Sequence, residues 1–123
     1  MRRSQPQRDW RDSVAKLEAE GCCRVCSVER GLQQAHTAGR RFDVTRPGRK
    51  TLWVNPDAIV PLCPHCHHDY DAHDLDLLPY LTLDEQLYVV KVMGGIEAAR
   101  IRLAPRDYAR DIQAARVEAE LVS

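Results

Sequence analysis

Apolar side chains recur at helical spacing near the start of the chain. Trp10, Val14 and Leu17 occupy the i, i+4 and i+7 positions of one helix face, and Gly21 provides a natural C-terminal stop. The pattern therefore predicts a short helix over residues 9–20, preceded by a polar and basic arm.

Helical spacing returns in the last third of the chain. Thr82 and Glu85 have the spacing of a capping box, and the helix that they begin should end at the glycine pair 94–95. A shorter helix is expected over residues 96–103, and Pro105 can open a last one. We expect the last helix to pack on the body of the domain through a heptad-like stripe of Tyr108, Ile112, Ala115, Ala119 and Val122.

The middle of the chain has short apolar segments separated by turn residues, which is typical of strands. Residues 31–37, 51–54 and 59–62 are the strand candidates, and residues 38–50 between them form an arginine-rich loop. After the last strand, residues 64 to about 73 are expected to be helical. This order of elements predicts an α+β fold.

Length and composition allow one small globular domain. The chain has 123 residues, of which 44% are hydrophobic and only 6% aromatic, so a modest core needs a further stabilising element. We expect residues 1–81 to form the functional domain with its basic arm and first helix. Residues 82–123 are expected to be a helical extension packed on it.

Five cysteines lie in two tight groups, Cys22-Cys23-x-x-Cys26 and Cys63-x-x-Cys66. The odd number, the two C-x-x-C pairs and the lack of a recognisable secretory signal favour a metal in a reducing, cytoplasmic compartment over disulfides. The spacing predicts a structural Zn²⁺ held by Cys23, Cys26, Cys63 and Cys66. Two alternatives stay open, a redox dithiol and a site in which Cys22 replaces Cys23.

All five histidines lie between residues 36 and 73. On a helix, His67 and Asp71 would point the same way, and such a pair is half of a divalent-metal site or simply a solvated helix face. His36 ends a predicted strand, where a lone histidine is usually a hydrogen-bonded structural residue. Closing the zinc site should bring it beside the helix after Cys66, where a neutral imidazole near a metal could accept a proton from water.

The order of these motifs resembles the HNH endonucleases, and in particular small zinc-containing members encoded by phages and prophages. The resemblance covers residues 22–75 and rests on the first C-x-x-C pair, Ala35-His36, Gly39-Arg40, an Asn/Asp-containing turn, and Val60-Pro61-Leu62-Cys63-x-x-Cys66-His67. It implies a β-hairpin and a helix around one divalent ion, the ββα-metal motif.

The resemblance also implies roles for individual residues. His36 would be the general base and His67 a ligand of a catalytic Mg²⁺, Mn²⁺ or Ni²⁺, with Asp71 as a further ligand. In such a mechanism, Arg40 or Arg41 could hold the scissile phosphate through paired N–H donors, and the alternative for each is a solvated loop residue.

Two positions depart from the family pattern. Ala35 stands where a metal-binding Asp, His or Glu usually precedes the base, and Ala58 stands where the middle Asn is expected. Asn55 or Asp57 could supply the function of that Asn. Because the motif is incomplete, a DNA-binding module with a decayed nuclease site is the alternative, and a zinc-dependent protein-interaction domain is a third possibility.

The charge distribution bears on the partner. Net charge is zero, which by itself argues against nucleic acid, but residues 1–50 carry 12 Lys and Arg against 6 Asp and Glu, and residues 51–123 carry 6 against 12. The basic half, at +6, can neutralise DNA phosphates, while the other half is at −6. No apolar run approaches the roughly 20 residues of a membrane span, so no membrane partner is expected. Likeness to phage members suggests a role in genome processing or packaging beside a terminase.

Overall fold

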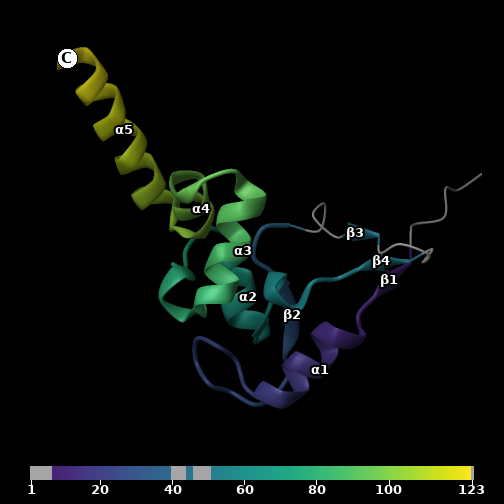
Figure 1. The fold of residues 1–123 in the computed structure, drawn as a ribbon. Coiled ribbons are helices and arrows are strands. Elements are labelled where there is room, and N and C mark those ends of the chain that lie inside the picture. The colour runs from purple at the N-terminus through teal and green to yellow at the C-terminus, as the bar shows by residue number, and fades with distance from the viewer. Residues whose placement is uncertain (1–6, 40–43, 46–50, 123) are drawn as a thin grey trace, which may run out of the picture.

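The computed structural model describes residues 7–39, 44–45 and 51–122 (Figure 1). The chain is mixed α/β, with five α-helices and two small sheets in the described part. The predicted loop over residues 38–50, including Arg40 and Arg41, lies mostly outside these residues, although 44–45 form a short strand.

A two-stranded antiparallel sheet followed by a helix forms the centre of the molecule. Strand β2 (Gln33–His36) pairs with β5 (Ile59–Leu62), so that His36 lies opposite Ile59. Helix α2 (Pro64–Asp71) follows β5 after a single residue, with proline at its first position. These are the strands expected over 31–37 and 59–62 and the helix expected from residue 64, each within a few residues of its predicted end.

The second sheet is made of three very short strands in the order β1-β4-β3. Strand β1 (Arg8–Asp9) runs parallel to β4 (Leu52–Trp53), and β3 (Val44–Thr45) runs antiparallel to β4. Strand β1 takes the last residue of the predicted arm and the first residue of the predicted helix, because their backbone pairs with a segment more than forty residues away. Helix α1 (Arg11–Glu20) therefore begins two residues later than predicted and ends as expected at Gly21, whose φ is 68°.

Three helices complete the fold. Helix α3 (Leu83–Met93) begins with the predicted capping box and ends at Gly94, whose φ of 87° favours glycine. Helix α4 (Ile96–Leu103) and helix α5 (Arg106–Val122) follow. In Figure 1, α5 projects away from the rest of the chain. Ala115 and Ala119, from the stripe expected to pack on the body, are exposed.

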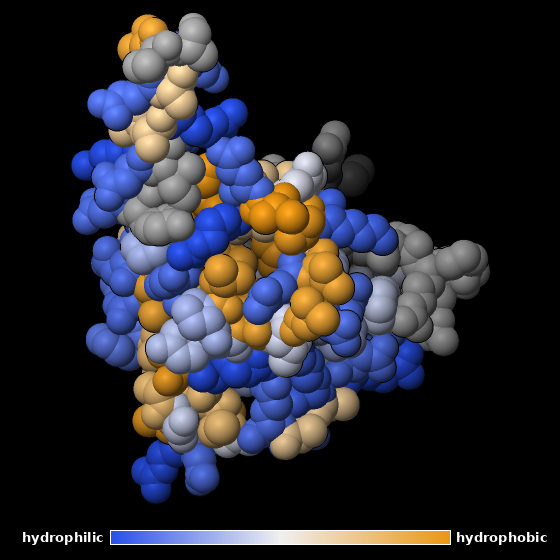
Figure 2. Space-filling view, turned by 60° about the vertical axis from the view of Figure 1, so that its left-hand side comes forward, coloured by the Kyte–Doolittle hydropathy of each residue, from blue (hydrophilic) through white to orange (hydrophobic). Residues whose placement is uncertain are grey.

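The main core brings the two halves of the chain together. It joins buried residues of the β2–β5 sheet and α2 to Leu77, Val89 and Leu103 from later elements. The short helix η3 (Leu78–Tyr80) borders it, and Ala58 of the short helix η2 (Pro56–Ala58) belongs to a second buried cluster. Figure 2 shows apolar side chains gathered on the face that carries α3 and α4, where Leu83 and Ile96 are exposed.

A buried carboxylate connects α3 to the N-terminal region. Glu85 is 1% exposed, and its oxygens accept from Lys16 Nζ at 2.5 Å and Arg24 Nη1 at 2.6 Å. Lys16 Nζ also donates to the carbonyl oxygens of Pro56 and Ile59, at 2.6 and 2.7 Å. The network ties α1, the first cysteine pair, β5 and α3 to one another.

Candidate metal centre

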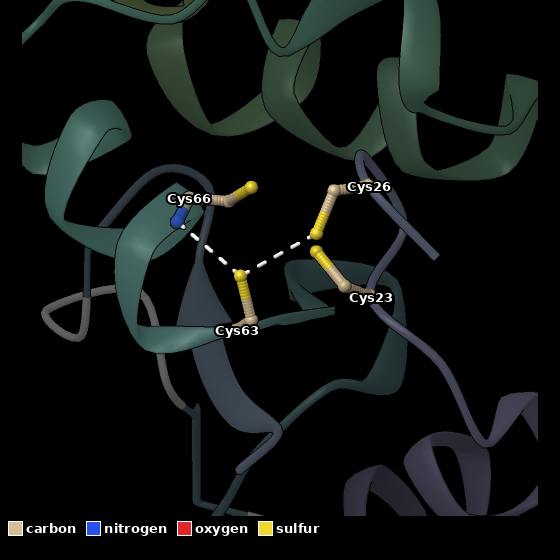
Figure 3. Close-up of side chains that lie close together, drawn as sticks. All are labelled: Cys23, Cys26, Cys63 and Cys66. Carbon is tan, nitrogen blue, oxygen red and sulfur yellow. Dashed lines mark hydrogen bonds between the residues drawn. The ribbon is translucent and has the colours of Figure 1, made fainter. Parts of the chain in front are cut away.

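Four cysteine side chains converge at the start of α2 (Figure 3). Cys23 and Cys26 come from the turn after α1, and Cys63 and Cys66 come from the first turn of α2. All four sulfurs lie within 4.8 Å of one another, and Cys26 Sγ is 3.6 Å from Cys63 Sγ. Three of the four residues are buried, whereas Cys26 is exposed.

Local backbone structure aims each pair at the common point. Cys63 is the N-cap of α2, and its Sγ accepts from the backbone N–H of Cys66 at 3.5 Å. In the other pair, Cys23 N donates to Val28 O at 2.8 Å and Ser27 N donates to Cys23 O at 3.0 Å, which closes a tight turn. The positive φ of Ser27, 66°, belongs to this turn.

The cluster fits a tetrahedral metal ion. Zinc–sulfur bonds of about 2.3 Å place the sulfurs of a tetrahedral site roughly 3.8 Å apart, close to the separations found here. Two converging C-x-x-C pairs favour a shared ion over a redox dithiol. The cluster contains Cys23, and Cys22 is not part of it, which decides between those two candidates.

The thiols differ in how readily they ionise without a metal. Burial acts to raise the pKa of Cys23, but backbone N–H groups of Cys26, Cys63 and Val25 outweigh it and lower the pKa to about 6. Burial and the neighbouring thiols raise the pKa of Cys66. A bound cation would favour the thiolate form at all four positions, since ligation requires deprotonated sulfur.

A second group of possible metal donors lies farther along α2. His67 Nε2 is 3.5 Å from Asp71 Oδ2, and His67 Nδ1 is 2.7 Å from Gln33 Oε1 on β2. When Nδ1 donates its proton to Gln33, Nε2 presents a lone pair on the side of Asp71. Metal-binding histidines are oriented by a hydrogen bond of this kind from the ring nitrogen that does not face the metal.

This pair offers two protein ligands. Among the described residues, the four cysteines are the one group of three or more metal-ligating side chains. Ala35 is fully buried and has no donor to add. An ion at His67 and Asp71 would therefore take its remaining ligands from water or phosphate, as Mg²⁺ commonly does.

The side chain of His36 lies on the other side of β2. Side chains on β2 alternate between two faces, and Gln34 and His36 share the face toward α1. Ser13 Oγ of α1 donates to Gln34 at 2.9 Å, and the rings of Trp10 and His36 meet edge to face at 5.7 Å. The intervening residues face α2, as the Gln33–His67 contact shows. We expected His36 to lie beside the helix after Cys66. Its strand, β2, does lie beside that helix, α2, but the imidazole itself packs toward α1.

The remaining candidates have local roles. Asn55 Oδ1 accepts from Asp57 N at 2.9 Å and so caps η2. Ala58 is buried, and its carbonyl accepts from the backbone N–H of Thr37 at 3.0 Å. Arg40 lies outside the described residues.

Sequence reasoning did not find two of the residues that shape this region. Gln33 orients His67, and Tyr70 donates its hydroxyl to Thr37 O at 2.6 Å, fixing the end of β2 against α2. Tyr70 could have been recognised as the apolar partner of Cys66 four residues earlier on the helix. Nothing in the sequence marks Gln33.

Comparison with known proteins gives no match. No family model matches the chain, and neither the curated proteins nor the solved structures contain a significant match. In the part of the chain that the structure describes, no helix has the length and apolar character needed to cross a bilayer.

Proposed function

We propose that the protein is a metal-dependent endonuclease of the HNH type that hydrolyses DNA phosphodiester bonds, with the four-cysteine zinc site holding its fold together. The observation that carries the proposal is the orientation of His67 by Gln33, which turns Nε2 toward Asp71. This pair lies on a helix that follows an antiparallel strand pair, an arrangement compatible with the ββα-metal motif.

Each residue then has a defined task. His67 and Asp71 would hold a divalent ion such as Mg²⁺, Mn²⁺ or Ni²⁺, which supplies charge neutralisation at the phosphate and the leaving oxygen. His36 would accept the proton of the attacking water through its imidazole.

Duplex binding without cleavage is the second candidate. Three observations favour it: the imidazole of His36 packs toward α1, Ala35 supplies no ligand, and the side-chain oxygen of Asn55 is used in a cap. The two functions share the zinc site and the DNA partner, and they differ in whether a bond is broken. Genome processing or packaging beside a terminase is the pathway that we propose for either function.

The deciding experiment is cleavage of supercoiled plasmid by zinc-loaded protein with Mg²⁺, Mn²⁺ or Ni²⁺ added. His36→Ala and His67→Ala should each lower the nicking rate at least about 100-fold, the usual scale for loss of an acid–base or metal-ligating group. His65→Ala is the matched control, because His65 also faces a carboxylate one turn on, Asp69 at 3.3 Å, but is 84% exposed.

The outcomes separate the candidates. Unchanged cleavage by His36→Ala and His67→Ala, with the zinc content intact, would remove the nuclease assignment from this site. If no metal supports cleavage by the wild type while duplex DNA is bound, the binding module becomes the function.

A further inference from the structure

A hollow of about 330 Å³ lies where α2, α4 and α5 meet, and its polar lining is mainly basic. We propose that it binds a backbone phosphate of duplex DNA, outside the candidate cleavage site. The inference rests on the proposed function insofar as DNA is the ligand. The walls of the hollow are formed by His73, Ile101, Ala104, Arg106, Arg110 and Gln113.

The described lining of the hollow is cationic and neutral, although Asp107 and Asp111 adjoin its two arginines in the sequence. Arg106 and Arg110 are exposed and stand one turn apart on α5, a spacing at which like charges repel. None of the described lining residues is acidic, and within the described part of the chain neither arginine forms an ion pair. Two positive charges held close together in this way attract an anion.

Other arginines of the same region are already paired. Arg100 on α4 donates to both oxygens of Asp76, at 3.0 and 2.8 Å. Arg116, farther along α5, lies 3.0 Å from Glu97. The absence of a carboxylate is therefore particular to the described residues of the hollow and not a general property of this surface.

Backbone contacts fix the two walls of the hollow to each other. Arg106 N donates to His73 O at 2.8 Å, and His73 N donates to Tyr70 O at 3.0 Å, so the start of α5 is attached to the end of α2. Arg106 Nη2 also approaches Ala72 O at 3.5 Å. The backbone walls of the hollow are therefore in place before a phosphate binds, and only the arginine side chains need to be ordered.

The hollow also lies close to the candidate nuclease residues. His73 follows Asp71 by two residues at the end of α2. On α4, Arg102 Nε donates to Thr37 O at 3.0 Å, directly after His36, with its guanidinium 5.9 Å from the Tyr70 ring centre. A strand whose phosphate reached His36 or Asp71 could therefore place a neighbouring phosphate in the hollow.

Planar guanidinium groups and histidine suit a phosphodiester, because each Arg can donate two parallel hydrogen bonds to phosphate oxygens. The proposal extends the DNA surface to the second half of the chain, whose overall charge is negative. The net charges of the two halves of the chain did not predict a basic site here, because Arg106 and Arg110 are local exceptions in an acidic segment.

The test is binding of a fluorescent 20-base-pair duplex, followed by anisotropy over a salt series without added divalent ion. The double variant R106A/R110A should bind about tenfold or more weakly than the wild type. The slope of log K against log salt should fall in magnitude by about 1 to 2, since each phosphate contact contributes about 0.9. R116A, on the same helix but paired with Glu97, is the control and should bind as the wild type does.

Each other result overturns the proposal. Wild-type affinity in R106A/R110A, an equal loss in R116A, or no duplex binding by the wild type would do so. A hollow that takes only free phosphate would show thermal stabilisation by inorganic phosphate that is lost in the double variant, with duplex binding unchanged. Plasmid cleavage is measured separately. If the variants bind DNA as expected but the wild type never cuts, the proposed nuclease activity is refuted. If the wild type cuts but R106A/R110A binds DNA as the wild type does, the proposed phosphate site is refuted.

Discussion

At the scale of single residues, the surroundings of Glu85 decide its charge. Burial alone would raise the pKa of this carboxyl, but hydrogen bonds from Arg24, Lys16 and the backbone of Thr82 lower it to about 2. The folded state therefore prefers the ionised form strongly. Its stability depends on that charge being present.

Replacing the charge while keeping the shape should be costly. Glu85→Gln leaves Lys16, whose side chain is 20% exposed, without its carboxylate, and leaves Arg24, 16% exposed, with the carboxylate of Glu20. Breaking a buried pair in this way costs about 3 kcal/mol or more. Urea unfolding at pH 6 measures this loss of unfolding free energy. Glu20→Gln is the control: it removes a more exposed partner of Arg24 and should cost less than about 1 kcal/mol.

The same variant has a defined pH signature. Because the pKa in the folded state lies below the ordinary 4.5, the stabilisation is complete above pH 4.5 and is lost as the pH falls toward 2. The difference in unfolding free energy between wild type and Glu85→Gln should therefore shrink across that interval. A difference that stayed constant from pH 6 to pH 3 would contradict this account.

At the scale of elements, the caps decide where helices begin and end. Thr82 Oγ1 accepts from Glu85 N at 3.3 Å, and Glu85 Oε1 accepts from Thr82 N at 2.7 Å. Cys63 plays the corresponding role for α2 with its sulfur. These caps are local in sequence, which is why the helices were predicted to within a few residues.

Removing the cap of α3 gives a small, directional effect. Thr82→Ala should destabilise the protein by about 1 kcal/mol, because the backbone N–H of Glu85 loses its acceptor, while Thr82→Ser should stay within a few tenths. Both are measured by urea unfolding at pH 6. Equal stability of the two variants would show that the hydroxyl contributes nothing as a cap.

The short strands and the orientation of His36 were beyond the reach of sequence. Strands β1 and β3 have two residues each, too few for any periodicity, and exist because β4 pairs with both. The candidate position of His36 at a strand end was correct. Which face it would occupy depends on the packing of α1 and α2 against opposite sides of β2, which no local pattern encodes.

At the scale of the whole molecule, the cysteine cluster closes a long loop. The four residues were predicted from spacing alone, since the motif repeats the same donor geometry twice. What spacing left open was the choice between Cys22 and Cys23, because adjacent cysteines differ only in the direction the backbone gives them. The structure places Cys23 in the buried cluster and leaves Cys22 half-buried outside it.

Metal content should follow that assignment. Purified wild type should carry one zinc per chain. Cys23→Ser or Cys63→Ser should lose both the metal and cooperative thermal unfolding, since ligation contributes folding free energy directly. Cys22→Ser should keep both. Elemental analysis and thermal melts measure the outcome, and loss of zinc from Cys22→Ser with retention in Cys23→Ser would reverse the assignment.

The ion pairs of Glu85 with Lys16 and Arg24 also have a consequence for folding during translation. Lys16 and Arg24 leave the ribosome before Glu85 does, so their cations stay in water until α3 has emerged. A nascent chain that ends at residue 81 has the strands and cysteines of the central fold but not the carboxylate that neutralises these two charges. The N-terminal region should therefore reach its final packing only after α3 has emerged to complete it.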